Sequence, residues 1–276
     1  MNTLRQKRLA IIFLVLFCFL NRTFAGEEKT HFVVVIPSYN NARWAQKNLE
    51  SIISQTYSNW SIIYVDDCST DKTGDIVEHF IHKHHLQKKC TLIRNKKRCG
   101  ALANIYNAVH MCNPKHVVAI VDGDDWLAHS KVFEKLAYIY ADKKIWLTYG
   151  NFQSDPTGWG SCCARIPRKV RRHNSFRKHD WVASHLRTFY AKLFHHVKKE
   201  DLMLNGEFFA MTYDMAITFP MLEMASKEHF FFIRDILYIY NVANPIMDCR
   251  VNAELQVKLD VHIRSLPPYS PLDTLF

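Results

Sequence analysis

The sequence lacks several short motifs that identify common classes of protein. It contains no G-x-x-x-x-G-K-[ST] segment, which excludes a P-loop nucleotidase. No G-x-G-x-x-G segment follows the first apolar run, which argues against a Rossmann dinucleotide enzyme. None of the eight cysteines belongs to a C-x-x-C pair, so a structural zinc site is not expected. The sequence therefore excludes a P-loop site and favours neither a Rossmann dinucleotide site nor a structural zinc site.

Long hydrophobic runs are also missing. The N-terminal apolar segment, residues 9–20, would span only about 18 Å as a helix, short of the roughly 30 Å hydrocarbon core of a bilayer. It follows a basic N-terminus and precedes Thr23-Phe24-Ala25, which resembles a signal-peptidase site. We therefore predict a signal peptide over residues 1–25, cleaved after Ala25, with an uncleaved signal-anchor as the alternative. Either form predicts a protein in the lumen of the secretory pathway or associated with a membrane.

The rest of the composition is that of a globular protein. The chain has 276 residues, 48% hydrophobic and 22% charged, which suits one domain with a sizeable core. The net charge of +10 favours anionic partners, and much of it lies in residues 165–179, where no acidic residue interrupts the basic ones. This basic segment suits an acidic acceptor, with a solvated loop as the alternative. Nucleic acid is not an expected partner, because Phe176 is the only aromatic residue in the segment.

Strand and helix patterns alternate along the chain. Apolar runs rich in β-branched residues predict strands over residues 32–36, 61–65, 91–93, 117–121 and 230–240. Apolar residues at helical spacing predict helices over residues 42–55, 71–85, 101–111, 181–196, 216–225 and 251–263. This alternation is typical of an α/β fold with a mostly parallel central sheet and helices on both faces. We predict one domain over residues 30–265, with a first half over residues 30–150 and a second half over residues 151–265. A Pro-containing tail follows over residues 266–276.

An acidic cluster, Asp122-Gly123-Asp124-Asp125, directly follows one of the predicted strands. Three carboxylates at the end of a buried strand raise the cost of ionising one another. A cation would offset this repulsion, and oxygen ligands at this density suit Mg²⁺ or Mn²⁺ shared with a phosphorylated substrate. The alternative is a simple turn, because Asp-Gly is a strong turn signal.

Polar and aromatic side chains follow the other predicted strands as well. Tyr39 follows the first strand, Asp66 and Asp67 follow the second, and Arg98 lies after the third. Ligands of parallel sheets bind outside the carboxyl ends of the strands. We therefore expect an aromatic ring, paired carboxylates, a guanidinium and the acidic cluster to face one crevice, as a nucleoside diphosphate requires.

These segments, in this order, resemble the opening of glycosyltransferase family 2, whose members have the GT-A fold. The resemblance is carried by VVVIPSYN (33–40), SQTY (54–57), YVDDCSTD (64–71), residues 100–104 and residues 121–125, and it is strong over residues 32–150. It implies a metal-dependent, inverting transferase that moves one sugar from a nucleotide sugar, expected to be UDP-linked, to an acceptor hydroxyl. The Gln-x-x-Arg-Trp element of processive synthases is absent, so a single addition is expected.

The resemblance also implies roles in binding the donor. Tyr39 would stack on the base, Asp67 would hydrogen-bond it, and Asp66 would support the loop between them. Arg98 would face the diphosphate. The expected donor-binding residues are Pro37, Tyr39, Asp66, Asp67, Arg98, Asp122, Gly123 and Asp124.

The remaining implied roles concern the metal and the proton transfer. Asp122 and Asp124 match the D-x-D element, which would hold the ribose and a divalent cation, Mn²⁺ or Mg²⁺, and Asp125 would extend this metal cluster. Such an ion acts as a Lewis acid on the departing diphosphate. The catalytic base would be Asp214, with Glu207 as the second candidate. The alternative for Asp214 is the N-cap of a helix, where Asp is favoured.

Acceptor recognition is expected from the second half of the chain, because the donor motifs end before it. His185 and Arg187 are the candidate acceptor-binding residues, with support of the core as the alternative for each. Tyr213 stands where the family usually has Glu before the base. The expected acceptors are a glycan, a lipid-linked acceptor or a protein, acidic ones included. A second class of function is a secreted, non-catalytic protein that binds carbohydrate or nucleotide and retains the GT-A fold.

Overall fold

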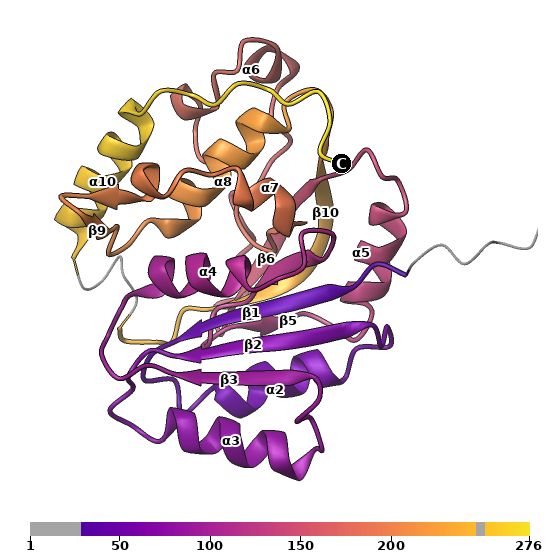
Figure 1. Ribbon diagram of the computed structural model, residues 1–276, viewed down its shortest axis with the longest axis vertical. Helices are drawn as coiled ribbons and strands as arrows, with labels where there is room; N and C mark the ends of the chain where they lie inside the picture. Colours follow the sequence, from indigo (N-terminus) through magenta and orange to yellow (C-terminus); the bar gives the residue numbers. More distant parts are fainter. Residues whose placement is uncertain (1–28, 247–251) are drawn as a thin grey trace, which may run out of the picture.

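Strands and helices alternate through the first half of the chain, as the sequence predicts (Figure 1). The computed structural model describes residues 29–246 and 252–276, so the predicted signal segment, residues 1–25, lies outside the described residues. The elements of this half are β1 (Phe32–Ser38), α2 (Ala45–Ile53), β2 (Trp60–Asp66), α3 (Thr73–Lys83), β3 (Cys90–Arg94), α4 (Ala101–His110), β4 (Val117–Ile120), β5 (Trp126–Leu127) and α5 (Val132–Tyr140).

The second half adds shorter elements around two long ones. They are β6 (Leu147–Asp155), α6 (Arg168–Arg172), the 3₁₀ turn η1 (Phe176–Lys178), β7 (Thr188–Tyr190), α7 (Ala191–His195), the 3₁₀ turn η2 (Lys199–Leu202), β8 (Met203–Leu204), β9 (Glu207–Phe208), α8 (Tyr213–Met224), β10 (Phe230–Asn241) and α10 (Ala253–Ser265). The helix predicted over residues 181–196 is wrong, because its centre is strand β7. The β-branched and aromatic residues of β7 pair with β4 on one side and β6 on the other, and this pairing overrides the helical spacing.

The central sheet has eight strands in the order β3-β2-β1-β4-β7-β6-β10-β5. Four of its seven strand pairs are parallel, which confirms the predicted mostly parallel α/β sheet. The chain passes through α2 and α3 on one side of the sheet and returns through α4 on the other, so that β4 lies beside β1 (Figure 1). This reversal of direction leaves a crevice at the carboxyl ends of β1 and β4, where ligands of such sheets bind.

The core lies around β1 and β4, which are buried along their whole length. Helices cover both faces of these strands, and for that reason their sequences are continuous apolar runs rather than alternating ones. Phe32 of β1 stacks on Phe133 of α5 with 5.1 Å between ring centroids, and Leu49 of α2 and Ile105 of α4 are fully buried. This packing fixes the strand ends at which the crevice forms.

The basic segment, residues 165–179, is not a uniform solvent-exposed surface. Arg177 is only 6% exposed, and its guanidinium donates to both carboxylate oxygens of Glu223, at 2.6 and 3.0 Å. It also donates to the carbonyl oxygen of Ile263 at 2.7 Å. These bonds join η1 to α8 and α10, so Arg177 holds the second half of the chain together.

We expect Arg177→Met to lower the free energy of unfolding by about 3–5 kcal/mol, because the substitution leaves the carboxylate of Glu223 buried without its partner. Arg168→Met, on the exposed surface of α6, is the matched control and should change it by less than about 0.5 kcal/mol. Urea denaturation followed by circular dichroism measures both. Equal midpoints for the two variants would show that the Arg177 pair does not stabilise the fold.

Candidate active site

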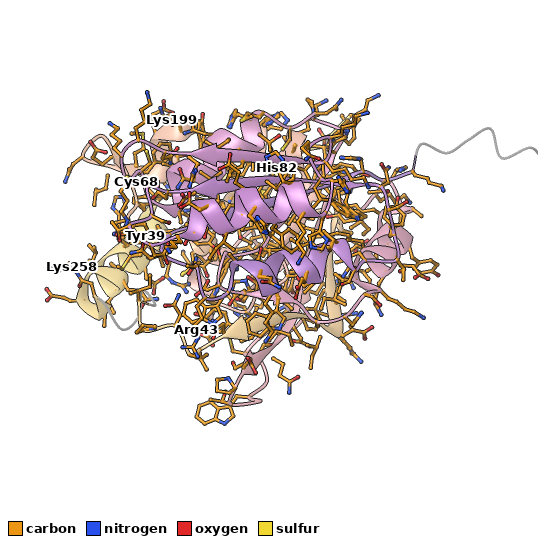
Figure 2. All side chains as sticks on the ribbon, turned by 90° about the horizontal axis from the view of Figure 1, so that it is seen from below. Tyr39, Arg43, Cys68, His82, Lys199 and Lys258 are labelled. Atoms are coloured by element: carbon orange, nitrogen blue, oxygen red, sulfur yellow. The ribbon has the colours of Figure 1, made fainter. Side chains whose placement is uncertain are left out.

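A cleft of about 280 Å³ opens at the carboxyl ends of β1 and β4. It brings together most of the residues predicted from the sequence, from both halves of the chain. The predicted residues that line it are Pro37, Tyr39, Asp67, Arg98, Asp122, Asp124, Asp125, His185, Arg187 and Asp214. Asp66, Gly123 and Glu207 are not among its lining residues. Viewed from the α3 side, Tyr39 and Cys68 lie at the same end of the molecule as Lys258 of α10 (Figure 2).

The carboxylate of Asp67 is fixed in place at the end of β2. Its Oδ1 accepts hydrogen bonds from Asn95 Nδ2 at 2.8 Å and from the backbone N–H of Cys99 at 2.9 Å, and its Oδ2 accepts one from the N–H of Gly100 at 2.8 Å. Burial opposes ionisation of Asp67, but these hydrogen bonds outweigh it and lower its pKa. Asp67 is therefore an ionised acceptor with lone pairs to spare on Oδ2.

Tyr39 and Arg98 form the wall next to Asp67. The guanidinium carbon of Arg98 lies 3.9 Å from the centroid of the Tyr39 ring, a cation–π contact. Arg98 itself is exposed. The predicted cation thus covers the aromatic face, rather than lying beside the acidic cluster.

Asp66 and Gly123 lie behind the cleft and shape its loops. Asp66 accepts a hydrogen bond from the backbone N–H of Ser69 at 3.2 Å, which closes the turn after β2. The N–H of Gly123 donates to the carbonyl oxygen of Pro37 at 3.1 Å. A Cβ at position 123 would lie 2.4 Å from Ser38 Oγ, so only glycine allows this close approach of the two loops.

Asp122 and Asp124 face the cleft, and each has a partner from the second half of the chain. The Tyr213 hydroxyl contacts both carboxylate oxygens of Asp122, at 2.5 and 2.7 Å, and Asn244 Nδ2 donates to Asp124 Oδ2 at 2.6 Å. Burial, and then the neighbouring charge of Asp124, raise the pKa of Asp122 to about 7. The two carboxylates therefore lie where a bound cation would stabilise their ionised forms.

Asp125 is the most deeply buried member of the acidic cluster, with 1% of its surface exposed. Its Oδ2 accepts from the Tyr238 hydroxyl and its Oδ1 from the N–H of Asn241, both at 2.7 Å. Burial, followed by the charges of Asp124 and Asp122, raises the pKa of Asp125 well above its usual value. Asp125 thus ties the acidic cluster to β10.

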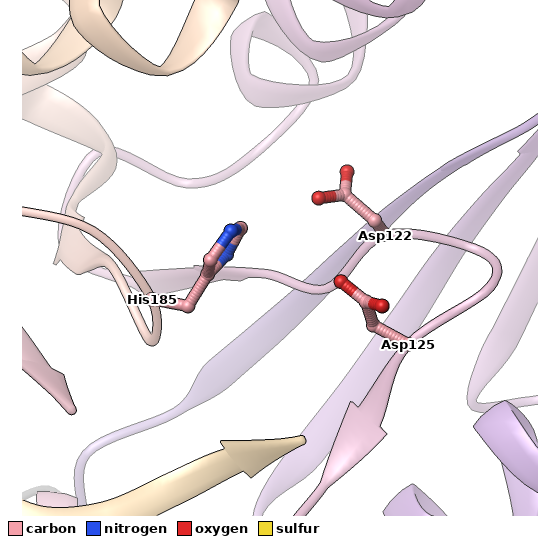
Figure 3. Close-up of side chains that lie close together, drawn as sticks. All are labelled: Asp122, Asp125 and His185. Atoms are coloured by element: carbon pink, nitrogen blue, oxygen red, sulfur yellow. The ribbon is translucent and has the colours of Figure 1, made fainter. Parts of the chain in front are cut away.

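His185 completes a group that fits a divalent cation (Figure 3). Ligand atoms of Asp122, Asp125 and His185 all lie within 4.8 Å of one another, and the imidazole points toward the two carboxylates. Burial, and then the charge of Arg187, hold the pKa of His185 well below its usual value, so its ring is neutral, the form that binds metals. The group contains two of the predicted metal ligands, Asp122 and Asp125. It includes His185 in place of Asp124.

Arg187 and Asp214 line the cleft from the second half of the chain. Asp214 is the second residue of α8, whose N-cap is Thr212, so the alternative role of Asp214 as the N-cap is wrong. Its side chain is 27% exposed, and its Oδ2 lies 3.9 Å from Nη1 of Arg187. Arg187 is 1% exposed. The second candidate base, Glu207, is exposed on the short strand β9, away from the cleft.

Some residues that contact the acidic cluster were not predicted from the sequence. Asn241 ends β10, and Asn244 follows it, so the rule that placed Tyr39 and Asp67 after their strands would also have identified these two. Tyr238 lies inside β10, and nothing in its sequence context indicates that its hydroxyl reaches Asp125.

Comparison with known proteins gives one family. The model of glycosyl transferase family 2 matches residues 33–198. Glycosyltransferase GlyG of Streptococcus pneumoniae is 28% identical over 220 residues, which are 75% of this chain and 69% of GlyG. The putative colanic acid biosynthesis glycosyl transferase WcaA of Escherichia coli is 28% identical over 120 residues, 41% of this chain. The match spans only 42% of WcaA, less than half of its length.

Solved structures show the same fold at low sequence identity. Staphylococcus aureus TarS, crystallised as residues 1–349 in complex with UDP-GlcNAc, has a TM-score of 0.57 and 15% identity over 77% of this chain and 58% of that chain. The mannosyltransferase PcManGT of Pyrobaculum calidifontis, in complex with GDP-Man and Mn²⁺, has a TM-score of 0.57 and 17% identity over 94% of this chain and 73% of that chain. These similarities confirm the predicted GT-A fold.

The predicted localisation in the secretory pathway is wrong. A translocated transferase needs its donor sugar in a lumen supplied by transporters, whereas the relatives GlyG and WcaA come from bacteria. Within residues 29–246 and 252–276, no helix has the length and apolar character needed to cross a membrane. The predicted cleavage after Ala25 falls outside the described residues.

Proposed function

Because the chain belongs to glycosyltransferase family 2, we propose that it transfers one sugar from a nucleotide sugar to an acceptor hydroxyl, with inversion and with a divalent cation bound. One observation carries the proposal. A single cleft contains a flat aromatic wall at Tyr39, an ionised acceptor at Asp67, the acidic cluster and a partly exposed carboxylate at Asp214. A non-catalytic binding protein would not need the last of these.

The proposed donor is a UDP-sugar. Uracil has one imide N–H, and the free lone pairs of Asp67 Oδ2 offer it an acceptor while Tyr39 offers a surface for stacking. For this stacking, Arg98 would leave the ring or cover the base from its other side. TarS, which shares the fold, binds UDP-GlcNAc and UDP, and this supports the proposal.

Asp122 and Asp124 are proposed to hold Mn²⁺ or Mg²⁺, with Asp125 and His185 beside them. When bound, the cation supplies a Lewis acid that offsets charge on the diphosphate. The chain's own contribution is to hold the carboxylates in place through the hydroxyl of Tyr213 and the other groups that contact them. PcManGT, another protein of this fold, was crystallised with Mn²⁺.

Asp214 is proposed as the base. The acceptor oxygen forms a bond to the anomeric carbon and passes its proton to the Asp214 carboxylate. The bond between the anomeric carbon and the diphosphate oxygen breaks, and its electron pair leaves with the nucleoside diphosphate. Because the Asp214 side chain is 27% exposed in the cleft, an acceptor hydroxyl can reach it.

A lipid-linked glycan is the proposed acceptor. The Escherichia coli relative WfaP, 28% identical over 43% of this chain, is a glucosyltransferase that acts on GlcNAc-diphosphoundecaprenol. Among the described residues, none that lines the cleft belongs to the basic segment 165–179. An acidic acceptor would therefore contact that segment only outside the cleft.

We expect the protein to release UDP from at least one UDP-sugar when Mn²⁺ and an acceptor are present, and EDTA to lower the rate by at least about 100-fold because the diphosphate loses its counter-charge. A coupled assay for UDP over a panel of donors measures this, and added Mn²⁺ should restore the rate. An unchanged rate in EDTA would contradict the metal assignment. Binding of UDP without release from any donor would favour the non-catalytic alternative.

A further inference from the structure

Arg187 is a buried charge without a hydrogen-bond partner. It is 1% exposed, and none of its three guanidinium nitrogens makes a hydrogen bond within the described residues. Its closest ionic contact is to Asp214 Oδ2, at 3.9 Å, which is too long for a hydrogen bond. A buried guanidinium without hydrogen bonds destabilises a fold even beside the charges of Asp214 and Asp122, so a bound ligand that supplies the missing acceptors would stabilise it.

The position of Arg187 is fixed by the sheet. It directly precedes β7, which runs antiparallel to β4, and its carbonyl oxygen accepts from the N–H of Ile120 at 3.3 Å. The start of β7 therefore lies beside the end of β4, where Asp122 begins the acidic cluster. Arg187 also lies near Tyr213, with its guanidinium carbon 5.7 Å from the centroid of the ring. Its side chain thus lies in the cleft between the cluster and Asp214.

Only two of the described residues that line the cleft, Arg98 and Arg187, carry a permanent positive charge. Arg98 is exposed and lies over Tyr39, in the wall proposed to bind the base. Arg187 lies near Asp122, in the part of the cleft proposed to hold the cation and the diphosphate. The diphosphate contact predicted for Arg98 is therefore better placed at Arg187.

We propose that Arg187 binds the β-phosphate of the donor, the phosphate that carries the sugar and departs with the nucleotide. This inference rests on the proposed function. A guanidinium presents its N–H groups in a planar fork that matches two phosphate oxygens, and all of these donors are available on Arg187. When the bond to the sugar breaks, the electron pair goes to a β-phosphate oxygen next to this fixed charge, which stabilises it without reorganisation.

The test is calorimetric titration with UDP and with UMP, both with Mn²⁺ present. Arg187→Met should weaken UDP binding by about 10–100-fold and change UMP binding by less than about 2-fold, because UMP has no β-phosphate. Arg98→Met is the matched control and should weaken both nucleotides to the same extent. If the parent protein bound UDP and UMP with equal affinity, the result would contradict the proposed function. If Arg187→Met still bound UDP more tightly than UMP by the same factor as the parent protein, only the role of Arg187 would be overturned.

The same titration with UDP-glucuronic acid and UDP-glucose shows whether Arg187 binds the β-phosphate or a carboxylate on the sugar. If Arg187 binds a sugar carboxylate instead, Arg187→Met would weaken only UDP-glucuronic acid and leave UDP unchanged, which would overturn the assignment to the β-phosphate. An equal loss of affinity for UDP, UDP-glucose and UDP-glucuronic acid would support the assignment.

Thermal unfolding without ligand supplies a readout that does not depend on binding. Arg187→Met should keep or raise the Tm, because it replaces a buried guanidinium that makes no hydrogen bonds by an apolar side chain of similar length. Arg177→Met, which removes a fully hydrogen-bonded buried arginine, should lower the Tm. Equal falls in Tm for the two variants would show that Arg187 supports the fold, and would overturn the proposal.

Discussion

Asp214→Asn is expected to lower the rate of sugar transfer by about 10²–10⁴-fold and to leave the affinity for UDP within about 2-fold of the parent protein. The amide has the size of the carboxylate but cannot take the proton of the acceptor. Asp214 lies 3.9 Å from Arg187 and belongs to α8, whereas the proposed base-binding residues Tyr39 and Asp67 follow β1 and β2, so the base of the donor is not expected to contact it. Turnover by UDP release and affinity by calorimetry measure the two quantities.

Glu207→Gln is the matched control for this prediction. Glu207 is exposed on β9 and does not line the cleft, so its substitution should leave transfer unchanged. The reverse pattern, with transfer lost in Glu207→Gln and kept in Asp214→Asn, would assign the base to Glu207. Loss of UDP affinity in Asp214→Asn would instead show that Asp214 contributes to the donor site.

Asp122→Asn is expected to weaken Mn²⁺-dependent UDP binding and the rate of transfer by at least about 100-fold, since a neutral amide is a poor ligand for a hard divalent cation. It should also raise the Tm of the metal-free protein, because it removes one of three carboxylates that raise the cost of ionising one another. Manganese binding followed by electron paramagnetic resonance measures the first effect without relying on turnover. Asp142→Asn, in the exposed turn after α5, is the control.

A full Mn²⁺ affinity in Asp122→Asn would contradict its assignment as a ligand. A lower Tm, with metal binding intact, would show that the Tyr213 hydrogen bonds to Asp122 are mainly structural.

The chain has Tyr213 where the family usually has a glutamate before the base, and this tyrosine contacts the acidic cluster. A glutamate before the base would bring a fourth carboxylate to the acidic cluster, whereas the Tyr213 hydroxyl donates a hydrogen bond to Asp122. This bond links the first turn of α8, which carries Asp214, to the loop after β4. The proposed base and the proposed metal ligand are thus positioned together.

The sequence was sufficient to predict the elements from β1 to β4 and the position of the cleft, whereas β5, α5 and β6 were not predicted. Both depend on local signals, because buried strands such as β1 and β4 are continuous apolar runs and their following residues meet at one edge of the sheet. Tyr39, Asp67 and Asp122 could therefore be placed in one cleft without knowledge of their contacts.

Features that depend on distant pairs could not be predicted. The strand character of β7 comes from its pairing with β4 and β6, and the burial of Arg177 comes from Glu223, 46 residues away. Neither partner is indicated by the local pattern of residues. In the same way, Arg98 and Arg187 are both basic residues near predicted strands, and only the contacts show that Arg98 covers Tyr39 while Arg187 is buried without hydrogen bonds.

A crystal structure with UDP and Mn²⁺ is the most direct test of the proposal that this cleft binds a nucleotide sugar. We expect the uracil to stack on Tyr39 and to donate its imide N–H to Asp67. The ion should lie between the diphosphate and the carboxylates of Asp122 and Asp124. A nucleotide bound elsewhere, or an ion that contacts no member of the acidic cluster, would contradict the proposal.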